Sequence, residues 1–111
     1  MNRNIQKITD SYLSCAAWSD SPEDATSSVF GSLSKALAYS DCAVFVAQAG
    51  DLLTDDWADE QIGHDFWLTR NDHGTGFWDR DLPNADALTM IATAFKTNYL
   101  FVSGNDELEI G

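Results

Sequence analysis

Residues 63–80 read GHDFWLTRNDHGTGFWDR, and this stretch decides the fold that the sequence predicts. Residues 64–70 are rich in strand-forming side chains, residues 71–74 are typical of a turn, and residues 76–80 return to strand formers. The stretch therefore predicts a β-hairpin whose turn is centred on Asp72 and His73. The facing pairs of this register are Trp67–Trp78, Asp65–Arg80, Phe66–Asp79 and Leu68–Phe77.

Helical periodicity surrounds this hairpin on both sides. Apolar residues recur every three or four positions over residues 4–18, 29–49 and 84–97, which predicts three amphipathic helices. Gly50 is a stop for the second helix, and Asn84 is a cap for the third. The apolar stripes are Ile5, Ile8, Tyr12 and Ala16 in the first helix, Phe30, Leu33, Leu37, Val44 and Ala47 in the second, and Leu88, Ile91, Ala92 and Phe95 in the third.

Shorter elements complete the predicted order. Thr54 can cap a short helix with acidic residues in its first turn, which ends at Gly63. Pro22 suits the first turn of another short helix over residues 21–24. Residues 99–103 and 107–110 predict a closing strand-turn-strand. The chain is therefore expected to form one α+β domain, residues 1–111, with helices packed on a small antiparallel sheet.

Composition excludes several classes of protein. The chain has 111 residues with 18 acidic and 6 basic side chains, a net charge of −12 and 44% hydrophobic residues. This apolar content is too high for a disordered acidic tail. No apolar run approaches the roughly 20 residues of a membrane-spanning helix. Direct binding to nucleic acid is disfavoured, because it requires clustered Lys and Arg.

Two features suggest the compartment. The N-terminal residues 1–4 show no apolar stretch behind their charge, so we expect no signal peptide. Cys15 and Cys42 are too few for a disulfide-stapled scaffold, and each sits among apolar residues as a structural thiol would. A disulfide or a reactive thiol is the alternative. We expect a protein of the cytoplasm.

The aromatic block also carries a family resemblance. GHDFWLTRNDHGTGFWDR resembles a block of small uncharacterised proteins from bacteriophages and related mobile elements. The resemblance extends to residues 11–18, to the acidic lead-in before Gly63 and to the closing strand-turn-strand, and it is weak over residues 19–32. The chain departs from the pattern at Asp72 and Thr75, where small residues are expected. The resemblance implies that the protein comes from a phage or prophage, where anti-CRISPR-like inhibitors are one possible type. It implies no enzymatic reaction.

The acidic residues suggest what such a protein could bind. Long-range attraction between opposite charges accelerates encounter, and exposed aromatic residues make strong anchors. We expect an acidic, nucleic-acid-mimicking surface that binds a host protein or ribonucleoprotein with a basic groove, in the cytoplasm of the host and without a cofactor. The acidic residues expected at this surface are Asp51, Asp55, Asp56, Asp59, Glu60, Asp65, Asp72 and Asp79, with Trp57 as exposed anchor.

Alternatives remain open at this point. The aromatic hairpin can be a folding nucleus or itself a binding surface. The protein can be a structural accessory of a phage, and an open sheet edge could pair two copies into a homodimer. A small metal-dependent enzyme is a third reading, but His64 and His73 would lie too far apart on the hairpin to share one metal. We predict no enzymatic activity, because no phosphate-binding or nucleophile motif is present.

Overall fold

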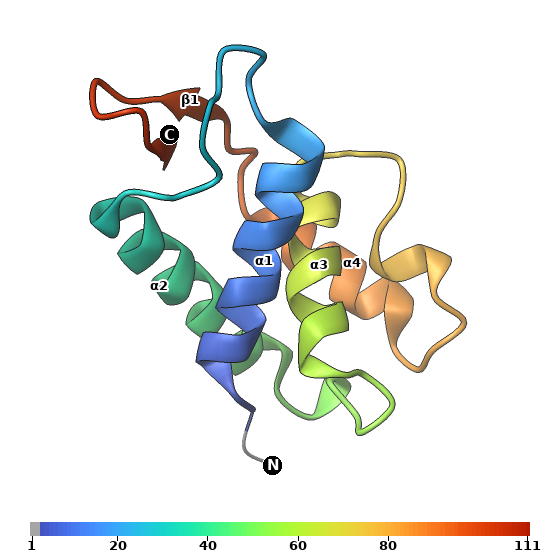
Figure 1. Ribbon diagram of the computed structural model, residues 1–111. Coiled ribbons are helices and arrows are strands. Elements are labelled where there is room, and N and C mark those ends of the chain that lie inside the picture. Colours follow the sequence, from blue (N-terminus) through green and yellow to red (C-terminus); the bar gives the residue numbers. More distant parts are fainter. Residues whose placement is uncertain (1–2) are drawn as a thin grey trace.

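The computed structural model describes residues 3–111, so Met1 and Asn2, which contribute to the signal-peptide prediction, lie outside the described residues. Within these residues, four helices and a two-stranded antiparallel sheet confirm the α+β class (Figure 1). The elements are α1 (Ile5–Asp20), α2 (Ser32–Ala49), the 3-10 turn η1 (Gly50–Leu52), α3 (Asp59–Arg70), the 3-10 turn η2 (Phe77–Asp79), α4 (Ala85–Ala94), β1 (Leu100–Val102) and β2 (Leu108–Ile110).

The central hairpin prediction is wrong, because residues 59–70 form the helix α3. A short run of buried aromatic residues has no clear periodicity, and neighbours on three sides bury this helix almost entirely. Gly63 does not stop a helix as predicted but lies inside α3 where α3 crosses α1. A Cβ atom at Gly63 would lie 2.1 Å from the carbonyl oxygen of Ile8, so only glycine permits this close approach. Figure 1 shows α1 and α3 side by side, and they form the most extensive helix contact.

The second half of the predicted hairpin forms η2 instead of a strand. Trp67 and Trp78 therefore do not face each other. Trp67 is fully buried and its ring meets the ring of Tyr12 edge-on at 5.2 Å, whereas Trp78 is 39% exposed. Of the predicted pairs, Asp65 and Arg80 do form an ion pair, at 2.7 Å, but the pair links a helix to the residue after η2. Phe66 is buried whereas Asp79 is exposed, so the predicted pairing of these two side chains is absent.

Helix α2 buries a different face from the predicted one. It begins at Ser32, and Phe30 is buried ahead of it in a bridge with Leu108. The rest of the predicted stripe is exposed: Leu33, Leu37, Val44 and Ala47. The face that packs into the core consists of Ser34, Ala38, Cys42, Phe45 and Ala49. Helix α2 carries two apolar stripes, and periodicity alone could not tell which one meets the core.

Other local predictions are confirmed. Helices α1 and α4 lie within two or three residues of their predicted bounds, and Leu88 and Ala92 are buried on the expected face of α4. Strands β1 and β2 pair antiparallel, with Phe101 opposite Glu109.

Residues 21–24 form a turn, so the short helix predicted there is wrong. Asn84 is the N-cap of α4, but at φ 66° its side chain makes no cap and donates to the carbonyl oxygen of Leu52.

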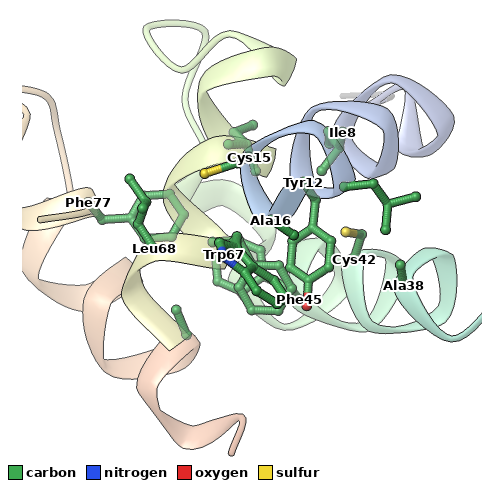
Figure 2. Close-up of a cluster of buried hydrophobic side chains, with 14 of the residues drawn as sticks. Ile8, Tyr12, Cys15, Ala16, Ala38, Cys42, Phe45, Trp67, Leu68 and Phe77 are labelled. Carbon is green, nitrogen blue, oxygen red and sulfur yellow. The ribbon is translucent and has the colours of Figure 1, made fainter. Parts of the chain in front are cut away.

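The buried side chains form one cluster at the junction of α1, α2, α3 and α4. Tyr12, Phe45 and Trp67 lie at its centre, with Phe77 and Leu68 at one end (Figure 2). The rings of Phe45 and Phe66 stack at 4.5 Å. Among residues 3–111, no helix is long and apolar enough to cross a membrane.

Candidate functional site

The candidate site is formed by two acidic segments, residues 50–58 and 79–86, which we call the acidic loop pair. Two hydrogen bonds hold the segments together. The indole Nε1 of Trp57 donates to the carbonyl oxygen of Pro83 at 2.8 Å, and Asn84 Nδ2 donates to the carbonyl oxygen of Leu52 at 2.9 Å. The ring of Trp57 also meets the ring of Phe77 edge-on at 5.4 Å. Carboxylates that are 30 residues apart in sequence therefore belong to neighbouring loops.

Arg3 holds the first segment from the inside. Its guanidinium donates to the carbonyl oxygens of Leu53, Thr54 and Trp57 and to Asp59 Oδ1, the last at 3.2 Å. The side chain of Arg3 is only 10% exposed. The positive charge of Arg3 therefore lies against the backbone of the loop and against Asp59, and it contributes little to the outer surface.

Arg80 holds the second segment in the same way. Its guanidinium forms two roughly parallel hydrogen bonds with the carboxylate of Asp65, Nη2 to Oδ1 at 2.7 Å and Nε to Oδ2 at 3.0 Å. Gln61 Nε2 also donates to this carboxylate, at 2.8 Å. The hydrogen bonds that Arg80 donates to the Asp65 carboxylate raise the pKa of Arg80 above its ordinary value, so Arg80 stays charged.

The third arginine is enclosed by the core. Arg70 is 6% exposed and donates to Asp41 Oδ2 at 2.7 Å, to the hydroxyl of Tyr12 at 3.2 Å and to the carbonyl oxygen of Lys96. Its guanidinium also lies 5.3 Å from the ring centre of Phe95. Burial of the hydroxyl raises the pKa of Tyr12 well above its ordinary value. All three arginines are consequently tied to internal partners.

The exposed charge is therefore almost purely negative around the acidic loop pair. Within residues 3–111, only Lys35 and Lys96 among the basic side chains form no ion pair. The exposed carboxylates of the loop pair form no ion pair with any residue in that range; they are Asp51, Asp55, Asp56, Asp79, Asp81 and Asp86. Such unneutralised charge creates a field that attracts a basic partner.

The structure separates the predicted site residues into groups. Asp51, Asp55, Asp56 and Asp79 are exposed on the acidic loop pair, and Asp72 is exposed on the loop after α3.

The remaining predicted acidic residues are paired. The side chain of Asp59 is 20% exposed and bound to Arg3, and Glu60 lies 3.5 Å from Lys7 with its side chain 61% exposed. Asp65 is completely buried and cannot present its charge to a partner, so its assignment to a binding surface is wrong.

Trp57 is also wrong as an exposed anchor, because it is completely buried between the two segments. Its indole joins the loops from within, which explains why an aromatic residue stands among so many acidic ones. The exposed tryptophan nearest in sequence to the loop pair is Trp78, at 39%. Trp78 lines an open groove of about 740 Å³ together with Asp72, Phe95 and Lys96. Sequence reasoning missed Trp78 because nothing local distinguishes an exposed tryptophan from a buried one.

Neither histidine of the aromatic block belongs to a cluster of possible metal ligands in the described part of the chain. Residues 3–111 contain no group of three or more His, Cys, Asp or Glu side chains placed to hold a metal. His73 Nε2 lies 2.7 Å from Asp20 Oδ2, which also accepts from Trp67 Nε1 at 2.6 Å. Because residues 64–70 are helical, the hairpin argument that separated His64 from His73 no longer applies.

The cysteines are free and buried, as expected for structural thiols. Burial raises the pKa of Cys15 and that of Cys42 to about 12. A nucleophilic cysteine needs the opposite shift, so these thiols remain protonated at neutral pH.

Comparison of the chain with protein-family models, with curated proteins and with solved structures gives no match.

Proposed function

We propose that this protein is a stoichiometric protein ligand whose acidic loop pair occupies a basic, nucleic-acid-binding groove on another protein. One observation carries the proposal: Arg3, Arg70 and Arg80 are bonded to internal partners, while the carboxylates of the loop pair are exposed and form no ion pair within residues 3–111. A groove lined with Lys and Arg attracts such a surface through the same long-range field that attracts phosphates.

The resemblance of residues 63–80 to phage proteins suggests the biological setting. In that setting the protein is made by a phage or prophage, acts in the cytoplasm of the host, and inhibits a nucleic-acid-binding defence complex of the CRISPR or restriction type. Inhibition by occupying the groove requires neither a cofactor nor an enzymatic step. The proposed binding residues are Asp51, Asp55, Asp56, Asp79 and Asp81.

Trp78 replaces Trp57 as the proposed aromatic anchor. It follows Phe77 on η2, next to Asp79, and it lines the open groove that also contains Asp72. An apolar or aromatic side chain of the partner can pack on the indole, a contact common at interface hot spots, whereas Lys96 in the same groove disfavours an arginine there. This arrangement gives the partner an apolar contact that nucleic acid lacks.

A pull-down from bacterial lysate, eluted over a salt gradient, tests the proposal. We expect capture of a nucleic-acid-binding complex that salt releases progressively, because screening weakens exposed charge pairs. The captured complex, once purified, should lose binding to its own DNA or RNA as this protein is added in equimolar amounts.

Matched variants locate the surface. The triple variant Asp55→Lys, Asp56→Lys and Asp81→Lys should weaken capture at least tenfold. The control Glu23→Lys, Asp24→Lys and Asp106→Lys changes the net charge by the same amount at exposed positions outside the loop pair and should bind nearly as wild type. Equal loss in both variants would show that only net charge matters, and no loss in either would refute groove occupation.

A phage structural accessory remains the second candidate, and an exposed apolar face on α2 favours it. This function predicts capture of the protein itself or of virion components instead of a host complex.

A further inference from the structure

Helix α2 exposes an apolar stripe that the fold does not use. We call it the outer face of α2, and it comprises Leu33, Leu37, Ser40, Val44 and Ala47. Leu33 is 71% exposed, Leu37 49% and Val44 42%. The residues are spaced by four, three, four and three positions, which is the repeat of a seam between two paired helices. The core takes the opposite face of α2, so the outer face is free for a second helix.

The stretch of chain that carries this face is almost without charge. Residues 25–50 contain only Lys35 and Asp41 as charged side chains, in a chain of net charge −12. The side chain of Asp41 is 37% exposed, but its charge is neutralised by an ion pair with Arg70 at 2.7 Å. A basic partner would find no carboxylate within residues 25–50 that lacks an ion-pair partner. Two copies of this chain, in contrast, repel each other through most of their surfaces, and on this face they can meet without bringing carboxylates together.

We propose that the outer face of α2 binds the same face of a second copy, with the two helices antiparallel. A twofold axis near Ser40 places Leu33 of one copy beside Ala47 of the other, and Leu37 beside Val44. Large side chains in the N-terminal half then meet small ones in the C-terminal half, so the gap between the helices has an even width. A parallel pair would set the two Leu33 side chains against each other and leave space at Ala47.

The expected dimer is weak. Helix α2 has 18 residues, so the seam is about 27 Å long. A single helix seam lies at or below the lower end of specific interfaces, about 1,200 Å² of total buried area. We therefore expect a dissociation constant on the order of micromolar to tens of micromolar. Added salt should strengthen the dimer, because it screens the repulsion between two strongly negative chains.

Sedimentation equilibrium over a range from about 1 µM to 1 mM tests the association. Leu37→Lys should raise the dissociation constant at least tenfold. The control Met90→Lys changes a side chain that is 75% exposed on α4 and should have no effect. Circular dichroism shows whether both variants stay folded. A wild-type protein that is monomeric throughout this range, or a dimer unaffected by Leu37→Lys, overturns the proposal.

Cysteine cross-linking tests the antiparallel arrangement. Under oxidation by copper-phenanthroline, Ser40→Cys should form a covalent dimer, whereas Leu33→Cys should not, because the two copies of residue 33 lie at opposite ends of the seam. Cys15 and Cys42 are buried and should not react. Efficient cross-linking of Leu33→Cys would refute the antiparallel seam.

The inference is separable from the proposed function. The loop-pair variant Asp55→Lys, Asp56→Lys and Asp81→Lys should dimerise at least as well as wild type. If the protein stays monomeric and Leu37→Lys abolishes capture of a host protein instead, the outer face belongs to that partner and self-pairing is refuted.

Discussion

The ion pair between Asp65 and Arg80 offers the sharpest test of the fold, because it ties α3 to the segment after η2. The side chain of Asp65 is fully buried, while that of Arg80 is 30% exposed. Three guanidinium hydrogen bonds and one from Gln61 satisfy the carboxylate. Replacing Arg80 by methionine keeps much of the apolar contact and leaves Asp65 without its countercharge.

The magnitude follows from the burial of Asp65. Removing one partner of a buried pair costs about 3–5 kcal/mol, because the other charge is left without compensation. Water can reach the Arg80 side of the pair, so we expect the low end, about 3 kcal/mol for Arg80→Met. Small domains have a total stability of about 5–15 kcal/mol, so this loss is large. The double variant Asp65→Leu and Arg80→Met should recover to within about 1 kcal/mol of wild type.

Urea denaturation followed by tryptophan fluorescence measures these free energies of unfolding. The control Lys96→Met removes a cation that forms no ion pair within residues 3–111, and its effect should stay within about 0.5 kcal/mol. The denaturant dependence of unfolding should be unchanged in all variants. If Arg80→Met costs less than about 1 kcal/mol, or if the two substitutions are simply additive, the pair does not stabilise this contact as argued.

Two further predictions concern the core. Gly63→Ala should destabilise the protein by about 2 kcal/mol or more in the same urea assay, since its Cβ would lie 2.1 Å from the carbonyl oxygen of Ile8, while Gly104→Ala, with no atom within 4 Å, should be nearly neutral; equal effects would contradict the close crossing of α1 and α3. Burial raises the pKa of both Cys15 and Cys42 from 9.0 to about 12. The protonated thiols therefore contribute their full stability to the folded state below pH 9. That contribution is lost as the pH rises from 9 towards 12, at on the order of 1 kcal/mol per pH unit for each thiol. The midpoint temperature of thermal unfolding should therefore fall steeply between pH 9 and pH 12. In the Cys42→Ala variant, this temperature should fall less steeply with pH.

Several elements could be predicted because their signals are local. Helix α4 shows one apolar stripe with Leu88 and Ala92, and the closing strands have a clear turn between them. Helix α1 likewise shows a single stripe that contains Ile8 and Tyr12. Where one stripe is present, there is only one face to bury, and local periodicity is enough.

The strand prediction for the aromatic block was wrong for a physical reason. Phe66 and Trp67 are both completely buried although they are adjacent in sequence, because α1, α4 and η2 all pack against α3. A helix enclosed in this way buries polar residues such as Asp65 and Arg70 together with its aromatic ones, so polarity does not reveal its period and its residues look like an aromatic strand. The same limit applies to α2, where only packing decides between two apolar stripes.

By itself, the sequence determined the surplus of carboxylates, the α+β class and the absence of a long apolar run, since these depend on composition and on neighbouring residues. Tertiary structure alone decided which charges face the solvent. Arg3 reaches the backbone near Trp57, and Arg80 reaches Asp65, through contacts between distant segments. The burial of Trp57 likewise depends on Pro83, which lies 26 residues further along the chain. Burial is a property of what packs around a side chain, and those neighbours come together only when the chain folds.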